Sequence, residues 1–260
     1  MKPTTKIKII QYRSDSSSEK ADDIASEKRL KILSNNREIL SLLCTPTMVK
    51  ELVVGFGLSE GLLKNSRDRD SQQEWCTERI EIFWKDNEIE VRLPIDMPEA
   101  AAALTSGCGK GVTFSLNKEL PVIKDNFTVS IDIIFELYKK FLRKSELFMA
   151  TGGVHSAALC NEQEILVFAE DIGRHNAVDK IIGYTFLENI TMQNKILLLS
   201  GRLSSEIISK SVRAEVPVLV SRAAPTDMAV ETARRHNITL IGFLRGHQLN
   251  IYSCPERIKK

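Results

Sequence analysis

The feature that most constrains the fold is a regular alternation of short apolar runs with amphipathic segments after residue 126. The runs 196–199 and 218–220 consist of Ile, Leu and Val alone, and each is followed by a segment of helical period. Strands that are apolar on both faces are typical of sheets covered by helices on both sides, which are mostly parallel. The pattern therefore predicts an α/β domain with a largely parallel sheet over 126–260.

The first half of the chain predicts a smaller α+β domain, which we place at residues 1–125. Alternating apolar and polar residues around 35–36 and around 86–87 predict two hairpins. Apolar residues at helical spacing predict a helix over 48–63. The Ser-rich and charged segment 14–28 is expected to be a loop, because it has too little apolar surface to bury.

The charge balance excludes several classes of partner. The 260 residues include 36 Lys and Arg against 34 Asp and Glu, which gives a formal net charge of +2. This balance argues against a nucleic acid or a membrane surface as partner. No apolar run reaches the roughly 18–20 residues of a membrane-spanning helix, and residues 1–30 lack the apolar core of a signal peptide. We therefore expect a cytoplasmic protein.

The cysteines are too dispersed for a disulfide framework or a Cys-x-x-Cys zinc site. They are Cys44, Cys76, Cys108, Cys160 and Cys254. Cys44 and Cys160 lie in apolar stretches and are expected to be buried. We expect no structural metal.

Four arginines stand close to the ends of apolar runs that are predicted to be strands. They are Arg174 after ILVFAEDIG, Arg202 after KILLLSG, Arg222 after VPVLVS and Arg245 within ITLIGFLRG. Because the carboxyl ends of parallel strands meet at one edge of a sheet, these side chains would form a receptor for phosphates there. The alternative is that each is a solvated loop residue or pairs with an acid such as Asp171 or Glu206. For any single arginine this alternative is favoured. If all four lie on the same edge, a phosphate receptor explains them at least as well as the alternative does.

Two histidines stand near the same strand ends. His155 follows a Gly pair, which permits close backbone approach to a ligand. Zinc deaminases have a Glu two residues after such a His and a later Pro-Cys-x-x-Cys; here Ala157 takes the Glu position and Cys254 has no partner. This excludes zinc hydrolysis. His175 is a candidate for orienting a ligand or capping a helix, although a lone His is more often structural.

The sharpest chemical feature is the segment 105–111, TSGCGKG. Cys108 lies between two glycines, which leave its thiol sterically open, and the neighbouring Lys110 favours the thiolate. A nucleophilic or persulfide-carrying cysteine is expected in such a place. A phosphate loop of the Walker type is excluded, because Leu104 and Gly111 stand where Gly and Ser or Thr are required. The alternative is a free Cys in a tight turn.

Six motifs together resemble the FdhD family, sulfur carriers required for formate dehydrogenase activity. They are TSGCGKG, TGGVHSAAL, EDIGRHNAVDKIIG, LLLSGRLSSEII, VSRAAPTDMAVE and GFLRGHQLNIY. The resemblance implies a C-terminal fold like that of the cytidine deaminases without their zinc chemistry. It also implies a cofactor-binding segment formed by Phe243, Leu244, Arg245, Gly246, His247 and Gln248.

The resemblance further implies a route for sulfur. A cysteine desulfurase places a persulfide on Cys108, and the sulfur passes to the molybdenum of a bis(molybdopterin guanine dinucleotide) cofactor before this cofactor enters apo formate dehydrogenase. The cofactor is then a bound substrate, recognised in part through its guanine nucleotides. One departure is that many members carry a Cys-x-x-Cys pair in this segment, whereas here only Cys108 is present.

Two functions are therefore weighed. The first is a sulfurtransferase with Cys108 as persulfide carrier, with Arg174, Arg202, Arg222 and Arg245 holding phosphates, and with His155 and His175 orienting the cofactor. The second is a chaperone that shields and delivers the cofactor without carrying sulfur, which the single loop cysteine keeps open. A hydrolase or deaminase inferred from the fold class alone is a third, weaker interpretation. A homodimer is possible for either function.

Overall fold

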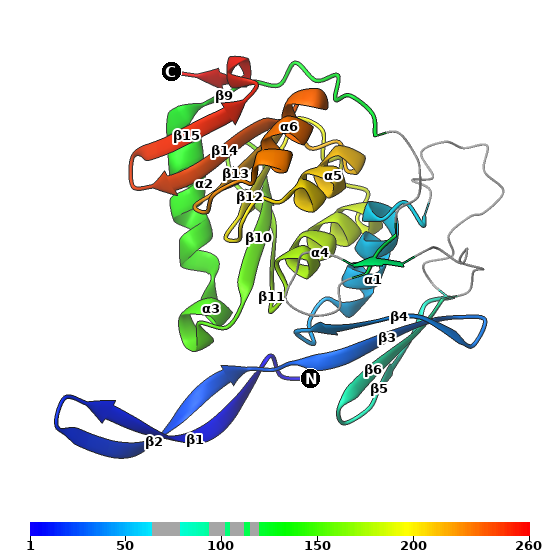
Figure 1. Ribbon diagram of the computed structural model, residues 1–260, viewed down its shortest axis with the longest axis vertical. Coiled ribbons are helices and arrows are strands. Elements are labelled where there is room, and N and C mark those ends of the chain that lie inside the picture. The colour runs from blue at the N-terminus through cyan, green and yellow to red at the C-terminus, as the bar shows by residue number, and fades with distance from the viewer. Residues whose placement is uncertain (64–78, 94–101, 105–111, 115–119) are drawn as a thin grey trace.

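The structure is a computed structural model, and it describes residues 1–63, 79–93, 102–104, 112–114 and 120–260. Its centre is a six-stranded sheet with the order β11-β10-β12-β13-β14-β15. The strands are β10 (His155–Cys160), β11 (Ile165–Asp171), β12 (Ile196–Leu199), β13 (Val218–Ser221), β14 (Thr239–Arg245) and β15 (Gln248–Ser253). The predicted α/β fold class is confirmed (Figure 1).

Parallel pairing is confined to the centre of this sheet. β12, β13 and β14 are parallel, whereas β10 pairs antiparallel with β11 and β12, and β14 pairs antiparallel with β15. The expectation of a largely parallel sheet is therefore right only for the three central strands. Short connections explain the difference: β10–β11 and β14–β15 are joined by tight turns, and such turns can link only antiparallel strands.

Helices cover both faces of the sheet. α4 (Arg174–Leu187), α5 (Ser205–Arg213) and α6 (Asp227–Arg235) pack on one face, and α2 (Ile131–Lys144) packs on the other, followed by the short α3 (Glu146–Thr151). Alternate residues of one strand enter different cores: Leu197 and Leu199 lie with α4 and α5, whereas Ile196 and Leu198 lie with α2. This two-sided burial explains why the strand runs are continuously apolar.

The N-terminal part forms a second sheet with the order β4-β3-β6-β5. Its strands are β3 (Lys28–Ser34), β4 (Arg37–Cys44), β5 (Glu81–Trp84) and β6 (Glu88–Leu93). Both predicted hairpins are confirmed by the antiparallel pairs β3–β4 and β5–β6. α1 (Val49–Ser59) covers this sheet and shares an apolar core with it.

Two short strand pairings lie outside these sheets. β7 (Ala102–Leu104) pairs with β8 (Val112–Phe114), and β9 (Val129–Ser130) pairs with β16 (Ile258–Lys259) after a 3-10 turn at Pro255–Arg257. None of the helices in the described part of the chain has the length and apolar character needed to cross a bilayer.

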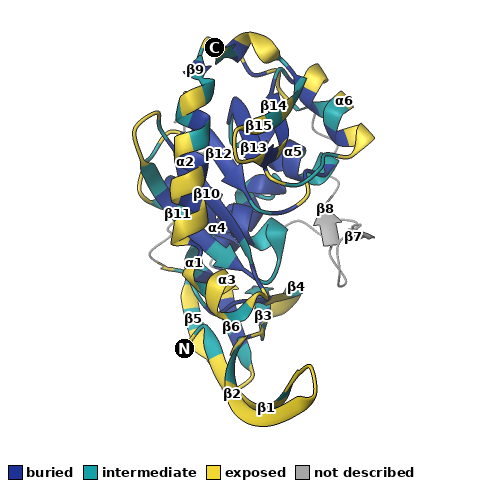
Figure 2. Cartoon of the chain, turned by 90° about the vertical axis from the view of Figure 1, so that its left-hand side faces the viewer, coloured by how far each residue is buried: buried dark blue, intermediate teal, exposed yellow. Residues whose placement is uncertain are grey.

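The expectation of a loop over 14–28 is wrong for most of its length. β1 (Thr4–Arg13) and β2 (Ser16–Ala25) form a long antiparallel hairpin that projects from the body, exposed on both faces (Figures 1 and 2). Backbone hydrogen bonds hold the two strands together. A ribbon of this kind needs little apolar surface, so the polar composition of β2 did not prevent strand formation.

The helices α1 and α4 approach each other at backbone distance. A Cβ atom added to Gly55 would lie 1.8 Å from the carbonyl oxygen of Asp179, and one added to Gly183 would lie 1.8 Å from that of Glu51. Only glycine permits this approach. The contact ties α1, from the N-terminal part, to the C-terminal part, and the division of the chain near residue 125 remains a prediction.

A buried ion pair anchors the segment that leads into α1. Lys180 Nζ lies 2.7 Å from Asp171 Oδ2, and both side chains are fully buried. Lys180 also donates to the carbonyl oxygen of Thr45 at 3.2 Å, while Asp171 Oδ2 accepts the backbone N–H of Thr45 at 3.1 Å. Buried charges of this kind are tolerated only when paired and hydrogen-bonded.

A second buried cluster anchors the other end of α1. Lys210 Nζ of α5 lies 2.9 Å from Asp179 Oδ1 and 2.8 Å from Glu60 Oε1, and it donates to Ser59 Oγ at 2.7 Å. Burial alone would lower the pKa of Lys210, but the adjacent carboxylates of Asp179 and Glu60 raise it. Lys210 therefore stays charged and links α1, α4 and α5.

We predict that Gly55→Ala destabilises the protein by about 3 kcal/mol, because the new methyl group forces the two helix backbones apart and outweighs the gain in helix propensity. Gly153→Ala is the matched control, since its Cβ would meet the Ala25 Cβ at an ordinary 3.4 Å. Urea denaturation of the two variants and wild type measures the effect. Equal stability of the two variants would contradict this account of the α1–α4 contact.

Candidate functional site

The predicted arginines lie at one edge of the central sheet. Arg202 follows the end of β12, Arg222 follows the end of β13, and Arg245 ends β14, and these three strands run parallel. β10 runs the other way, so its first residue, His155, begins at the same edge. β11 also ends there, and Arg174 opens α4 directly after it.

The arginines at this edge divide into two groups. Arg222 and Arg245 line a pocket together with His247. Arg174 lies beside His155, because a Cβ added to Gly201 would be 3.0 Å from Arg174 Cβ and 3.4 Å from His155 Nδ1.

Arg174 and Arg202 form the second group, and the pKa of His155 is affected by the positive charge of both. Its pKa is lowered by burial and by the positive charges of Arg174 and Arg202, and Asp171 opposes the shift in part. Its Nδ1 lies 3.5 Å from Ser200 Oγ, at the end of β12. The imidazole is therefore neutral at neutral pH, among fixed cations.

Three of the four arginines are free of carboxylate partners in the described part of the chain. No Asp or Glu there lies within 4.0 Å of Arg202, Arg222 or Arg245, and all three residues are exposed. Asp171 is instead bound by Lys180, and Glu206 contacts His175. The alternative in which nearby acids pair with these arginines therefore lacks support for these three.

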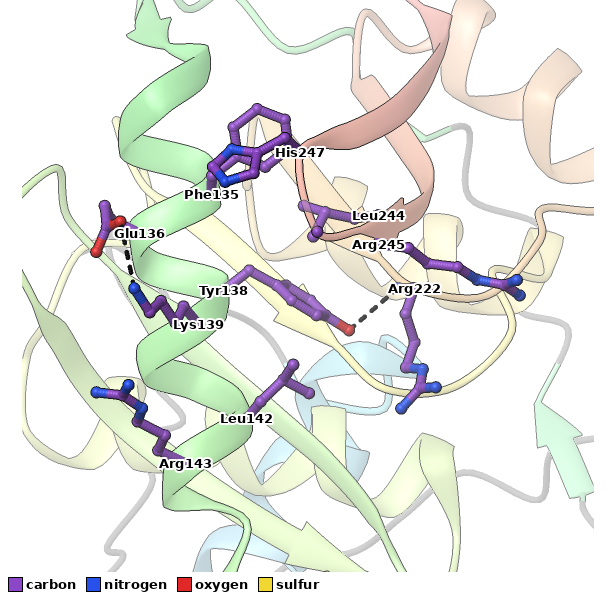
Figure 3. A pocket seen from close by; sticks show the side chains of 11 residues that line it. Phe135, Glu136, Tyr138, Lys139, Leu142, Arg143, Arg222, Leu244, Arg245 and His247 are labelled. Atoms are coloured by element: carbon purple, nitrogen blue, oxygen red, sulfur yellow. Dashed lines mark hydrogen bonds and ion pairs between the residues drawn. The ribbon is translucent and has the colours of Figure 1, made fainter.

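The pocket has a volume of about 700 Å³ and lies between α2 and the turn that joins β14 to β15 (Figure 3). It is lined by Phe135, Glu136, Tyr138, Lys139, Leu142, Arg143, Arg222, Leu244, Arg245, Gly246 and His247. One wall is aromatic, with the rings of Phe135 and His247 in an edge-to-face contact at 5.4 Å between centroids. The charged residues of the lining are four cations, Lys139, Arg143, Arg222 and Arg245, and one acid, Glu136. Such a pocket suits a flat, polyanionic ligand.

The predicted segment 243–248 contributes four of its six residues to this lining, from Leu244 to His247. Phe243 and Gln248 do not line the pocket. Phe243 has a positive φ of 53° and its N–H donates to the carbonyl oxygen of Ala223 at 3.2 Å. This bulged end of β14 is thereby tied to the backbone that follows Arg222.

The contribution of α2 was not predicted from the sequence. Its buried face, with Ile134, Leu137 and Phe141, packs on the sheet, and this leaves Phe135 and Lys139 beside the turn that carries His247. The helical spacing of Ile134, Leu137 and Phe141 predicts an amphipathic helix at about 129–146, but no local signal says which of its flanks meets a turn more than a hundred residues later.

Tyr138 fixes the backbone from which Arg222 projects. Its side chain is 1% exposed, and its hydroxyl donates to the carbonyl oxygen of Leu199 and accepts the N–H of Arg222, both at 3.1 Å. Figure 3 shows the bond to Arg222. Burial raises the pKa of Tyr138 to about 12, so this hydroxyl remains neutral. The ends of β12 and β13 are therefore joined through one side chain of α2.

The first turns of α4 and α5 meet near the second arginine group. His175 Nε2 of α4 lies 3.4 Å from Glu206 Oε2 of α5. Burial, with smaller contributions from Lys210 and Arg174, lowers the pKa of His175 to about 3. His175 is therefore a neutral ring that lies between the N-termini of α4 and α5, and such termini attract anions.

Cys108 and Lys110 lie outside the described residues, between β7 and β8, so their predicted roles stay predictions. Three other thiols can be placed. Cys44 and Cys160 are buried as expected, and burial raises the pKa of each to about 12. Burial also raises the pKa of Cys254. None of these three thiols is suited to act as a nucleophile at neutral pH.

The described residues contain no group of three or more His, Cys, Asp or Glu side chains placed to hold a metal ion. The polar groups at the sheet edge are instead mainly guanidinium and imidazole. Their chemistry favours phosphate recognition.

Comparison with known proteins agrees with this architecture. The model of the FdhD/NarQ family matches residues 25–259. The chain is similar to the sulfur carrier protein FdhD of Bacillus pumilus, with 35% identity over 99% of both chains. It is also similar to that of Listeria monocytogenes, with 36% identity over 96% of this chain and 97% of the relative.

A more distant organism and a solved structure extend the similarity. The sulfur carrier protein FdhD of Sulfurisphaera tokodaii is 36% identical over 97% of this chain and 98% of the relative. A crystal structure of a proposed formate dehydrogenase accessory protein from Desulfotalea psychrophila superposes with a TM-score of 0.75 and 27% identity, covering 99% of this chain and 100% of that one.

We predict that the neutral state of His175 makes the fold sensitive to acid. The unfolded chain binds a proton at the ordinary pKa of 6.5, whereas the folded chain does so only near 3, so the free energy of unfolding falls as pH is lowered through this window. Between about pH 7 and about pH 5 this group removes about 2 kcal/mol.

His175→Gln should remove this contribution, so the variant should lose less stability than wild type over the same range. Urea denaturation of each protein at both pH values gives its loss in free energy of unfolding. The difference between the losses of wild type and variant is the contribution of His175. An equal loss in the two proteins would show that His175 is not the group that titrates.

Proposed function

Because the chain belongs to the FdhD/NarQ family, we propose that it is a sulfur carrier that serves formate dehydrogenase. In this proposal a cysteine desulfurase donates sulfur to Cys108. The outer sulfur of the Cys108 persulfide then passes to the molybdenum of a reduced bis(molybdopterin guanine dinucleotide) cofactor, which would supply the two electrons that convert it to a sulfido ligand as the S–S bond breaks and Cys108 leaves as a thiolate. The cofactor is held as a substrate and is then delivered to apo formate dehydrogenase. The names of the relatives support the carrier role, and the name of the solved neighbour supports the link to formate dehydrogenase.

The observation that carries the proposal is a pair of arginines in the lining of an aromatic-walled pocket. Arg222 and Arg245 are exposed cations without a carboxylate partner in the described part of the chain, and both line a cavity of about 700 Å³. Guanidinium groups bind phosphate oxygens in pairs, and aromatic rings favour flat bases. The volume of this cavity lies within the usual range for small-molecule pockets, and a guanosine diphosphate group is of a size that such pockets hold.

The cofactor is larger than one nucleotide, and the rest of the sheet edge gives it further contacts. We assign Arg174 and Arg202 to phosphate groups outside the pocket, with His155 and His175 as neutral groups that orient the ligand. Phe243 and Gln248 flank the binding segment without lining the pocket. The zone of positive charge felt by His155 supports this extension.

The sulfur step requires one reactive thiol. The Cys108 thiolate attacks the terminal sulfur of the desulfurase persulfide; a new S–S bond forms on Cys108, the S–S bond on the desulfurase breaks, and the desulfurase leaves as a thiolate. Lys110 favours the attacking thiolate. The raised pKa values of Cys44, Cys160 and Cys254 make those thiols poor substitutes.

A chaperone function remains as the second candidate. The pocket and its arginines would bind and deliver the cofactor without any thiol, and the loop holds one cysteine where many family members have two. The two functions share the pocket and differ only in Cys108. Substitution of this residue therefore separates them.

We predict that Cys108→Ser abolishes sulfur loading. After incubation with a cysteine desulfurase and cysteine, wild type should gain the mass of one sulfur atom and the variant none. Cys254→Ser is the control and should load like wild type, because its thiol is poorly ionised. If Cys108→Ser loads fully, the assignment of Cys108 as the carrier is wrong. If this variant restores formate dehydrogenase activity in cells that lack the carrier, the chaperone function is favoured.

We predict that Arg222→Gln weakens guanosine diphosphate binding by about 10–100-fold, since a hydrogen bond to a charged group contributes about 1.5–3 kcal/mol. Arg235→Gln is the matched control, because Arg235 is exposed on α6 and does not line the pocket. Isothermal titration calorimetry measures both. Unchanged affinity in Arg222→Gln would place the nucleotide elsewhere.

A further inference from the structure

A buried hydroxyl joins two of the strand ends that carry arginines. Ser221, the last residue of β13, is 0% exposed, and its Oγ donates to the carbonyl oxygen of Gly201 at 2.8 Å. Arg202 directly follows Gly201, and Arg222 directly follows Ser221. Resting on the proposed function, we propose that Ser221 is a positioning residue, which fixes the spacing between Arg202 and Arg222 so that both guanidinium groups bind one diphosphate.

Ser221 lies at a level of the sheet where its neighbours are apolar. It is paired in register with Leu199 of β12, and Leu199 and Leu219 belong to the core beneath α4 and α5. Side chains alternate between the faces of a sheet, so Ser221 points into the same core as Leu219. A hydroxyl buried there is tolerated only when it is hydrogen-bonded. Its Oγ also accepts the N–H of Ala223, at 3.1 Å.

Tyr138 forms a link between the same strand ends on the opposite face of the sheet. Its hydroxyl binds the carbonyl oxygen of Leu199 and the N–H of Arg222, and Figure 3 shows the second bond. The two links hold different parts of the backbone. Tyr138 holds the end of β12 itself, whereas Ser221 reaches two residues further, to the residue directly before Arg202.

The loop after β12 is attached on both sides of its arginine. Before the arginine, the hydroxyl of Ser221 holds the carbonyl oxygen of Gly201. After it, the N–H of Leu203 donates to the carbonyl oxygen of Ala224 at 3.1 Å, and the carbonyl oxygen of Leu203 accepts the N–H of Thr226 at 3.0 Å. The backbone of the arginine is therefore fixed relative to β13. Removal of the hydroxyl would release the first attachment and leave the second.

The two arginines that flank this bond favour an anion between them. Both are exposed, and no carboxylate of the described residues lies within 4.0 Å of Arg202 or Arg222. Neighbouring strands lie about 4.8 Å apart, so the two cations start from nearby backbone positions and repel each other. A diphosphate has two adjacent phosphates and can bind both guanidinium groups.

The pocket indicates which phosphate each arginine contacts. Arg222 lines the pocket, whereas Arg202 does not. A guanosine diphosphate with its base in the pocket therefore places its first phosphate near Arg222 and its terminal phosphate toward Arg202. Guanosine monophosphate has no terminal phosphate. The preference for the diphosphate over the monophosphate therefore measures the contact with Arg202.

The test compares the affinities of the two nucleotides by isothermal titration calorimetry. We expect wild type to prefer the diphosphate by about tenfold or more, because hydrogen bonds between charged groups are strong. Ser221→Ala should lower this preference to about threefold or less, because Arg202 is no longer held in the bound position. Ser221→Cys nearly keeps the volume of serine but is a weak donor, and it should show the same reduced preference.

Two further variants separate positioning from stability. Ser211→Ala is the matched control and should keep the full preference, since Ser211 is also 0% exposed and donates to the carbonyl oxygen of Ile207 at 2.8 Å within α5. Arg202→Gln should lose the preference, and Ser221→Ala/Arg202→Gln should match Arg202→Gln, because Ser221 acts through this arginine. Full preference in either Ser221 variant or in Arg202→Gln, or an equal loss in Ser211→Ala, would overturn the inference.

Failure of the inference can be told apart from failure of the proposed function. If wild type binds both nucleotides equally well, the inference is overturned and the nucleotide pocket stands. If wild type binds neither nucleotide, the inference and the pocket both fail, whereas sulfur loading of Cys108 is read in a separate experiment.

Discussion

The close contact between α1 and α4 is the constraint on which the rest of the structure depends. Gly55 and Gly183 let the two backbones meet, and two buried lysines secure the contact before and after α1. Each lysine is paired with carboxylates inside the protein, where removing one partner would leave an uncompensated charge. The N-terminal sheet is thereby fixed to α4, and α4 begins with Arg174 at the edge where ligands are expected.

On the opposite face of the sheet, α2 completes the site. Tyr138 joins the ends of β12 and β13 by two hydrogen bonds, and Arg222 projects from the backbone that it holds. The bulged end of β14 brings His247 against Phe135. The pocket is thus built from two regular elements and one constrained turn. A rigid support of this kind suits the binding of a large charged ligand in one orientation.

Site residues could be predicted from the sequence where the topology of a parallel sheet alone determines their position. Arg222 and Arg245 could be placed together because parallel strands end at one edge, whatever the details of packing. The antiparallel pairing of β11 with β10 and of β15 with β14 follows from the short connections between them, and the expectation of a largely parallel sheet gave these connections too little weight. The contact of Phe135 with His247 joins residues far apart in the chain, and no local pattern encodes it. The hairpin β1–β2 was missed because backbone pairing alone holds it together.

The two parts of the proposed chemistry, phosphate recognition and sulfur transfer, differ in the observations that support them. The proposed phosphate recognition rests on arginines whose positions are described, whereas the proposed sulfur transfer rests on Cys108, which is inferred from its glycine neighbours and from family membership. The central claim is that a guanine nucleotide occupies the pocket between α2 and the β14–β15 turn. A crystal structure of the protein with guanosine diphosphate tests it most directly. We predict phosphate oxygens in contact with the guanidinium groups of Arg222 and Arg245 and the base beside Phe135 and His247. A nucleotide bound at any other place would contradict the account.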